Sequence, residues 1–343
     1  MIEFLSNYGL FFAKTLTFVL AIIVVLASFI SMTQKPRAED GLLLINNVNE
    51  KFQDVKDGVQ SEILSKADYK AWQKQEKKRE KEENKQEKKS SSKKPRLFVL
   101  RFDGDVKASE SLGLTECINA IIDTADKNDE VLLILESAGG YVHSYGHAAS
   151  QVHRIRDHQL KLTIAIDKCA ASGGYLMACI ANELIASPFA IIGSIGVVGQ
   201  MPNFHRLLEK NNIDYELHTA GEYKRTLTIF GENTDKQRDK FVEEIEVTHQ
   251  IFKDYVSKHR PMLDIAEVAT GEHWHAMLAL EKKLIDKIQT SDAFIMEALK
   301  DRQVFEISYQ EKQKMSDKFL SKLALQLEKS ALTLFTKFNL FKF

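Results

Sequence analysis

Cysteine is scarce in this sequence, and its placement argues against two classes of protein. The only cysteines are Cys117, Cys169 and Cys179, and no two of them form a CxxC pair. An odd number without paired spacing argues against a disulfide framework or a cysteine-based zinc site, so we expect buried free thiols. The sequence also lacks HExxH, and His143 and His147, four residues apart, have no evident third metal ligand. We therefore predict no metal and no cofactor.

Net charge is nearly absent as well. The 343 residues carry 47 Lys and Arg against 48 Asp and Glu, for a formal charge of −1, and 44% are hydrophobic. This balance gives no general attraction to nucleic acid, and the chain is long enough to bury a sizeable core. The charge is unevenly distributed, because residues 74–96 hold eleven Lys or Arg and five Glu without a large apolar side chain. We expect a solvated helix or tether there, with a membrane-surface contact as the alternative.

The two ends of the chain carry the longest apolar patterns. No charged residue occurs from Thr15 to Met32, which is long enough to cross a bilayer core. A cleaved signal peptide is the alternative, but Glu3 and the missing basic start argue against it. We predict a membrane anchor over residues 1–34 and a stem and basic linker over 35–96. Residues 311–343 form an amphipathic tail that suits either a membrane interface or packing against protein.

Between these ends, the pattern predicts a single α/β domain over residues 97–310. Short apolar runs of strand length occur at 97–102, 131–136, 161–167, 183–188 and 215–220, with amphipathic segments between several of them. Strands that alternate with helices favour a largely parallel sheet covered by helices.

Ser172 is the first candidate for chemistry in this domain. It stands in "KCAASGGYLMACIAN" (168–182), where Ser, Gly and Gly precede a helix-like apolar run. The same letters suit a nucleophile elbow or a tight turn into a buried helix. A second glycine pair follows a buried strand in "LILESAGGYVHSYG" (133–146), where backbone N–H groups could hold an oxyanion. Taken alone, that pair is only a turn into a helix.

A serine hydroxyl needs a base to become a nucleophile, and two kinds of base are open. Histidines His205, His218, His273 and His275 are scattered without an evident triad order, so a Ser-His-Asp arrangement stays possible. Lysine is the other choice, but only when it is uncharged and therefore withdrawn from water. Lys224, in "HTAGEYKRTLT" (218–228), is such a candidate.

Four stretches taken together resemble the signal peptide peptidase A family, including its inner-membrane members. They are the three quoted around Ser172, Gly140 and Lys224, together with "SPFAIIGSIGVVGQMPNF" (187–204). The resemblance implies a Ser-Lys dyad in which Ser172 is the nucleophile, Lys224 the general base and Ser194 a partner that orients the lysine. It also implies an oxyanion hole at Gly140 and Gly173. Ala138 stands where proline is more common in the family, which bears on loop rigidity alone.

The same resemblance implies a fold, an assembly and a location. The fold would be a Clp protease/crotonase-like spiral of ββα units preceded by an N-terminal transmembrane helix. Single-domain members form ring- or dome-like homo-oligomers, in which serine and lysine can come from neighbouring subunits. The implied protein is a membrane-anchored serine endopeptidase that cleaves hydrophobic or membrane-derived peptides and misfolded envelope proteins. It would lie in a bacterial inner membrane.

Two rival functions and one conflict remain at this point. A crotonase-like acyl-CoA enzyme would share the fold but need neither Ser172 nor Lys224. A catalytically silent membrane scaffold would use the fold to bind hydrophobic tails or other proteins. Lys35, Arg37 and the basic linker favour a cytoplasmic domain, whereas the family favours the periplasmic face, which we adopt.

Overall fold

The computed structural model describes residues 9–12, 14, 15, 17–19, 41–89 and 94–310. Residues Leu43–Gln310 form one compact unit, and the remaining ends are grouped as a second unit. The apolar run 15–32 and the tail 311–343 fall largely or wholly outside the described residues. No helix within the described ranges is long and apolar enough to cross a membrane.

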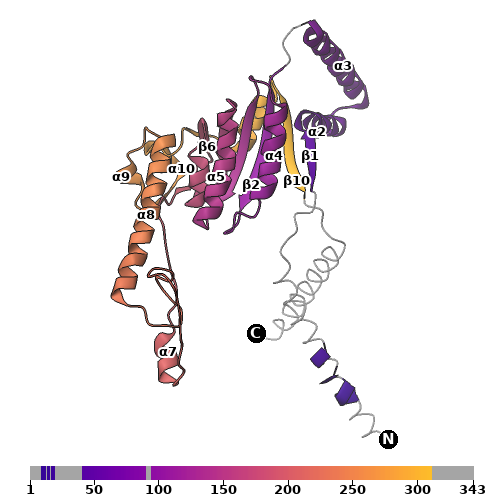
Figure 1. Ribbon diagram of the computed structural model, residues 1–343. Coiled ribbons are helices and arrows are strands. Elements are labelled where there is room, and N and C mark those ends of the chain that lie inside the picture. Colours follow the sequence, from indigo (N-terminus) through magenta and orange to yellow (C-terminus); the bar gives the residue numbers. More distant parts are fainter. Residues whose placement is uncertain (1–8, 13, 16, 20–40, 90–93, 311–343) are drawn as a thin grey trace, which may run out of the picture. The chain divides into compact units, whose positions relative to one another are not determined.

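A mostly parallel sheet forms the centre of the compact unit, as the alternation of strands and helices predicts (Figure 1). Its main row has the order β1-β10-β2-β3-β4-β6-β9. Neighbours β2 and β3 pair over eight residues, from Leu97↔Glu130 to Gly104↔Ser137. The bounds are β1 Leu42–Asn47, β2 Arg96–Gly104, β3 Glu130–Ser137, β4 Lys161–Ile166, β6 Glu183–Ala186, β9 Lys287–Ile288 and β10 Gln303–Gln310. The central strands are buried on both faces, which explains their near-continuous apolar sequences.

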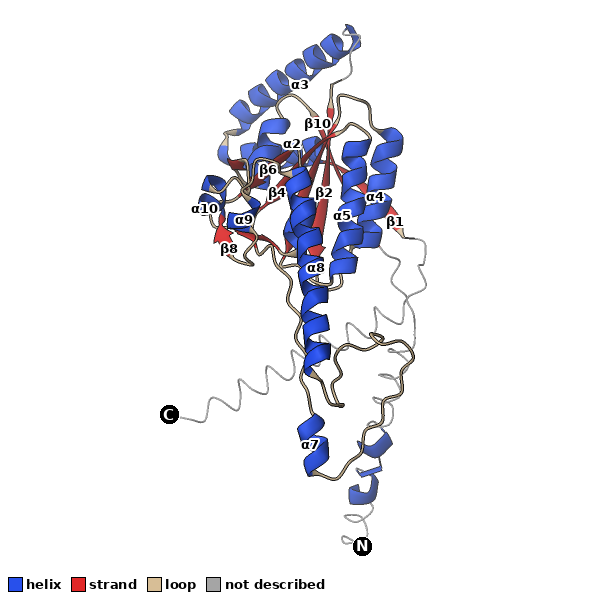
Figure 2. Ribbon diagram, turned by 60° about the vertical axis from the view of Figure 1, so that its left-hand side comes forward, coloured by secondary structure: helices blue, strands red, loops and turns tan. Residues whose placement is uncertain are grey.

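Helices cover both faces of this sheet (Figure 2). On one face, helices α4 (Ser111–Thr124), α5 (Val142–Asp157) and α6 (Gly173–Ala178) pack into the larger core cluster. On the other face, α11 (Ser291–Ala298) packs Ile295 and Ala298 against the alternate residues of β2 and β3. The short helices α9 (Ile265–Val268) and α10 (Ala276–Glu281) lie in the chain between helix α8 (Asp235–His259) and strand β9.

Three short strands branch from the carboxyl end of β3. Strand β5 (Cys169–Ala171) pairs with β3 through Ser137↔Ala170, and β7 (Ile191–Gly193) pairs in parallel with β5. Strand β8 (His273–His275) pairs with β7 in the antiparallel direction. Because β5 and β7 are parallel neighbours, the residues that follow them, Ser172 and Ser194, meet at one edge.

The sheet begins upstream of residue 97, where the sequence had suggested the domain boundary. Strand β1 joins β10 at the edge of the main row, so the segment 43–96 belongs to the compact unit. Helix α2 (Val48–Ile63) is tied to the start of β10, since the Asn49 side chain accepts from Val304 N–H and donates to Arg302 O. The basic run is largely helical, as α3 (Lys66–Lys89).

Residues 215–220, which were predicted as a strand from their apolar run, are not a strand in the structure. They belong to an irregular arm over 198–234 that also carries helix α7 (His205–Lys210) and lies beside the first half of helix α8 (Asp235–His259) (Figures 1 and 2). The aromatic side chains pack within the arm itself, Phe230 against Phe204 and Tyr215. Local ring packing therefore replaces the sheet pairing that the pattern suggested.

Candidate active site

Ser172 lies at a strained turn between strand β5 and helix α6. Its backbone has φ 51° and ψ −117°, a conformation that non-glycine residues adopt only when their surroundings impose it. Two hydrogen bonds hold the turn: Ser172 N–H donates to Gly193 O at 2.8 Å, and Leu176 N–H donates to Ser172 O at 3.0 Å. Of the two local structures that the sequence left open, this is the sharp strand-to-helix elbow that exposes a hydroxyl at its tip.

The two glycines after Ser172 are required by close packing. A β-carbon at Gly173 would collide with the ring of Tyr145, and one at Gly174 would lie 2.6 Å from Ser137 O. Tyr145 is itself fixed, because its hydroxyl donates to Asp105 O at 2.7 Å and lies 2.5 Å from the Ser137 hydroxyl. The elbow therefore turns against Tyr145 at Gly173 and against the end of β3 at Gly174, and neither position has room for a side chain.

A half-buried carboxylate holds the loop that leads into the elbow. Glu136, near the end of β3, accepts hydrogen bonds from the backbone N–H groups of Asp167, Lys168 and Cys169 at 2.9–3.1 Å. Burial is the largest influence on this group and raises the pKa of the Glu136 carboxyl, although these hydrogen bonds oppose the shift. The role of Glu136 was not predicted, although a glutamate at the end of an otherwise apolar strand is a signal for it.

The Gly139-Gly140 turn lies directly against the elbow. Gly139 has φ +88°, and a β-carbon there would lie 2.6 Å from Gly173 N and 2.8 Å from the Ser172 β-carbon. Gly140 is packed against the backbone of Val106 on its other side. Within the described chain, the N–H groups of Gly140 and Gly173 have no hydrogen-bond acceptor. Both are therefore available to a ligand next to Ser172.

Ser194 is the neighbour of Ser172 on the adjacent strand. Ala171 and Gly193 are register partners at the ends of β5 and β7, and each serine is the residue directly after its strand. Ser194 also has a positive φ of 54°, and its N–H donates to Glu272 O at 2.6 Å. The structure thus brings together Ser172, Ser194, Gly140 and Gly173, four of the five residues selected from the sequence.

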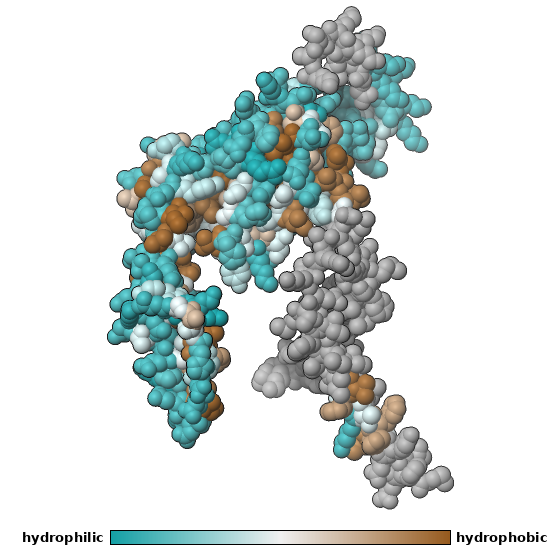
Figure 3. Space-filling view, in the orientation of Figure 1, coloured by the Kyte–Doolittle hydropathy of each residue, from teal (hydrophilic) through white to brown (hydrophobic). Residues whose placement is uncertain are grey.

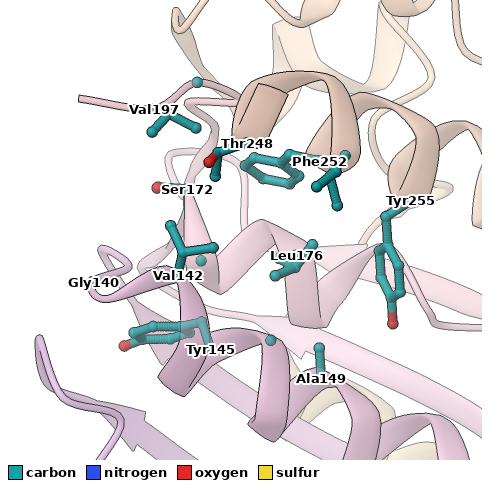
Figure 4. Close-up of a pocket in the computed structure, with 14 residues that line it drawn as sticks. Gly140, Val142, Tyr145, Ala149, Ser172, Leu176, Val197, Thr248, Phe252 and Tyr255 are labelled. Carbon is teal, nitrogen blue, oxygen red and sulfur yellow. The ribbon is translucent and has the colours of Figure 1, made fainter. Parts of the chain in front are cut away.

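An apolar pocket of about 410 Å³ opens beside Ser172, between helices α5, α6 and α8 (Figure 4). Apolar side chains also gather on the surface over the part of α8 nearest the sheet (Figure 3). The α8 wall was not foreseen, although the spacing of residues 248, 252 and 255 places them on one helical face. The lining residues are Gly140, Val142, Tyr145, Gly146, Ala149, Ser172, Gly173, Leu176, Gly196, Val197, Thr248, Ile251, Phe252 and Tyr255.

No carboxylate, imidazole or amine is among these lining residues, all of which belong to the described chain. All ten histidines are described, and none lines the pocket. His143 and His147 are exposed on α5, and the described residues contain no cluster of three or more metal-ligand side chains. A base for Ser172 is therefore not supplied by the pocket wall of one chain.

Lys224, the fifth candidate, lies on the arm instead. Its side chain is exposed, and its N–H closes a turn by donating to Gly221 O at 3.2 Å. The turn is held against the first turns of α8, where Glu222 pairs with Lys236 and the Tyr223 ring lies near the amines of Lys236 and Lys240. The structure therefore presents Lys224 at the surface and away from the pocket lining.

Helix α8 links the arm to the pocket and is anchored at its carboxyl end. Arg260, only 2% exposed, makes a bidentate ion pair with Asp286 at 2.8 and 2.9 Å and donates to Lys283 O. Asp286 in turn accepts from the N–H of Leu184 in β6 at 2.7 Å. This contact fixes the helix wall of the pocket relative to the sheet.

The cysteines are free thiols, as their spacing predicts. Cys117 and Cys179 are buried and Cys169 is half-buried. Burial raises the pKa of Cys117 to about 11 and that of Cys179 to about 12, so both remain protonated at neutral pH. These two thiols pack as small apolar groups and are unsuited to nucleophilic work.

Comparison with known proteins covers nearly the whole chain. Residues 3–152 match "Peptidase family S49 N-terminal" and residues 154–305 match "Peptidase family S49". "Probable protease SohB" of Buchnera aphidicola subsp. Acyrthosiphon pisum is 46% identical over 331 residues, 96% of this chain and 97% of the relative. The protein of the same name from Haemophilus influenzae is 46% identical over 345 residues, 98% of this chain and 97% of the relative.

Proposed function

This chain belongs to peptidase family S49 and is a serine-type peptide hydrolase, and from that premise we propose that Ser172 and Lys224 form its catalytic dyad. The observation that carries the proposal is the elbow. Ser172 alone among the pocket-lining residues combines a nucleophilic side chain with a strained backbone beside two unpaired N–H groups. Family membership also favours peptide hydrolysis over the acyl-CoA chemistry and the silent scaffold considered above.

In the proposed reaction, the Lys224 amine accepts the proton of the Ser172 hydroxyl while the oxygen attacks the scissile carbonyl. The N–H groups of Gly140 and Gly173 donate to the oxyanion that forms. The proton then passes from lysine to the leaving amine, which leaves an acyl-enzyme on Ser172. Water, deprotonated by the same amine, hydrolyses this ester. Ser194, next to Ser172 on the adjoining strand, would orient the amine.

The lysine in this reaction would come from a second copy of the chain. Two observations support this: the pocket wall of one chain offers no base, and Lys224 sits on an arm that projects beside α8 with several exposed apolar side chains. These include Val198 at 85%, Leu207 at 56% and Ile213 at 54% exposure. Exposed apolar groups are typical of surfaces that a partner covers. A repeated head-to-tail contact of this kind would close a ring or dome, as the family resemblance implies.

The substrates we propose are hydrophobic peptide segments. The pocket next to Ser172 is lined almost entirely by apolar groups, which favour an apolar substrate side chain. Residues 1–34 would anchor the protein in a bacterial inner membrane with the catalytic domain on the periplasmic side. Membrane-derived peptides and misfolded envelope proteins would then lie within reach. We place the domain in a Clp protease/crotonase-like spiral, of which the branched strands β5 and β7 would be a part.

Two inactive variants test the shared site. Ser172→Ala and Lys224→Ala should each abolish hydrolysis of a fluorogenic apolar peptide while the protein stays folded. When the two are co-expressed, about a quarter of the sites in a closed ring would pair an intact serine with an intact lysine, so activity should return to roughly that fraction. If no activity returns although mixed oligomers are shown to form, the shared site is contradicted.

A conservative variant tests the chemical role of the lysine. Lys224→Arg keeps the positive charge, but guanidinium stays protonated and cannot act as a base. It should therefore be as inactive as Lys224→Ala, whereas Lys236→Arg, at the neighbouring lysine paired with Glu222, should keep its activity. An active Lys224→Arg enzyme would exclude the dyad.

A further inference from the structure

The pocket beside Ser172 has two distinct ends. Ser172 and Gly140 lie toward one end and Tyr255 toward the other, with Leu176 and Phe252 between them (Figure 4). The wall from α8 runs from Thr248 to Tyr255, a separation of seven residues that spans about 10 Å along a helix. A side chain that enters beside Ser172 and follows this wall therefore points toward Tyr255.

Tyr255 is held at its end of the pocket by ring packing. It is half-buried and packs against the main core cluster, and its hydroxyl makes no hydrogen bond within the described part of the chain. Its ring centroid lies 4.6 Å from that of His259. His259 follows Tyr255 by one helical turn, so the imidazole supports the phenol ring from the side away from Ser172.

A second histidine continues this support onto helix α5. The rings of His259 and His153 lie 5.0 Å apart with an interplanar angle of 64°. His153 follows Ala149, another pocket-lining residue, by one helical turn. The layer of Ala149 and Tyr255 at the end of the pocket is thus backed by a layer of His153 and His259 that joins the two helices.

We propose that Tyr255 is the specificity-determining residue that limits the length of the substrate side chain bound next to the scissile bond, and that His259 is its positioning residue. This inference rests on the proposed function, because it takes Ser172 as the nucleophile and the pocket as the substrate site. A pocket with a fixed aromatic end accepts leucine or phenylalanine and rejects a longer rigid side chain. Apolar pockets discriminate in this way by about tenfold or more when a group of several carbons does not fit.

The test uses the full chain in detergent and two fluorogenic peptides, N-acetyl-Ala-Ala-X-aminomethylcoumarin with X leucine or 4-phenylphenylalanine. Tyr255→Ala should raise the kcat/KM ratio of the long over the short substrate by at least about tenfold. Tyr255→Trp should lower it, and Tyr255→Phe should leave it unchanged. The matched control is Val256→Ala, at the next residue of α8, which is buried in the core but outside the pocket.

A second set of variants tests His259. His259→Ala removes the support of the Tyr255 ring and should move the ratio toward the long substrate. His259→Phe keeps an aromatic ring in place and should restore the wild-type ratio. If loss of the ring acts only through stability, both His259→Ala and Val256→Ala will lower activity on the two substrates equally and leave the ratio unchanged.

The possible failures are distinguishable. If Ser172→Ala abolishes activity but Tyr255→Ala and Tyr255→Trp leave the substrate ratio within twofold of wild type, the length limit is refuted and the dyad stands. If Ser172→Ala retains activity, the proposed function fails first. A changed ratio in the Val256→Ala control would also overturn the assignment, because it would show that loosening of α8 is sufficient.

Discussion

At the scale of single residues, the site depends on glycines. The N–H groups of Gly140 and Gly173 can face a ligand only because Gly139 leaves the space in front of the elbow empty. Gly139 also has φ +88°, where a side chain adds backbone strain. The glycines of the "AGG" turn thus allow its backbone to approach the backbone of the elbow beside Ser172.

Gly139→Ala tests this directly. The methyl group would lie 2.6 Å from Gly173 N, so it should block the oxyanion position and lower kcat by about 10²–10³-fold. Steady-state kinetics on an apolar fluorogenic peptide would measure the loss. Gly58→Ala, on α2 with no atom near its β-carbon, is the control and should leave kcat at the wild-type value. An unchanged kcat in Gly139→Ala would place the oxyanion donors elsewhere.

At the scale of secondary-structure elements, helix α8 connects two functions. Its first half carries the arm that presents Lys224, and its second half forms one wall of the pocket beside Ser172. The Thr234–Gln237 capping box starts the helix, and the buried Arg260 ends it against the sheet. A helix capped at one end and anchored to the sheet at the other can hold the arm at a fixed distance from the pocket.

Arg260→Ala should show how much this anchor contributes. Loss of the buried Arg260 cation removes its donors to Asp286 and Lys283 O, which costs about 3–5 kcal/mol in the free energy of unfolding. Urea denaturation measures this change. The comparison is Arg238→Ala, which removes an exposed pair with Asp235 on the same helix and should cost less than about 1 kcal/mol. Equal losses in the two variants would contradict a special role for the anchor.

His259 makes the α5–α8 contact sensitive to acid. Burial lowers the pKa of His259 to about 4, and the positive potential of His153, Arg156 and Lys258 acts in the same direction against the opposing Asp157. The unfolded chain binds this proton near pH 6.5, so it holds more protons than the folded chain below that value. Stability should therefore fall as pH decreases from about 6.5 toward 4.

The pH dependence is measured as the urea midpoint at pH 7, 6 and 5. His259→Phe removes the titrating group but keeps the ring, so its midpoint should decline less over this range than that of the wild type. His158→Phe, at an exposed histidine outside this contact, should keep the wild-type decline. Parallel curves for wild type and His259→Phe would assign the acid sensitivity to other groups.

At the scale of the whole molecule, the compact unit is built independently of the chain ends. Residues Leu43–Gln310 contain the sheet, the elbow, the pocket and the arm. The apolar run 15–32 lies outside this unit in the sequence. Attachment to a membrane and hydrolysis of a peptide bond should therefore be separable properties.

Deletion of residues 1–34 tests that separation. The truncated protein should be recovered in the soluble fraction and cleave short apolar peptides at close to the full-length rate. Its cleavage of substrates embedded in vesicles should decline more, since an anchor over these residues would raise the local concentration of enzyme at the bilayer. Fractionation and parallel kinetics on the two kinds of substrate provide the measurement. Retention of the truncated protein in the membrane fraction would identify residues 311–343 as a second attachment.

Much of the fold could be predicted from local sequence. Four of the five apolar runs of strand length are strands β2, β3, β4 and β6, because residues buried on both faces of a parallel sheet must be apolar throughout. The fifth run, 215–220, forms no strand, since it lies in the arm, where Tyr215 packs against Phe230. Strand β1 was missed because its place beside β10 depends on a partner more than 250 residues away.

The sequence by itself determined that the chain turns at Ser172, because serine followed by two glycines suits a turn of either kind. The Gly139-Gly140 turn followed from its place after a buried strand, whereas Ser194 came only from the family resemblance. Only the tertiary structure decided that α8 walls the pocket, that Tyr255 ends it, and that Lys224 lies on an exposed arm apart from Ser172. The reason is physical: a turn depends on the residues within it, whereas a pocket depends on helices that meet only after the sheet has formed.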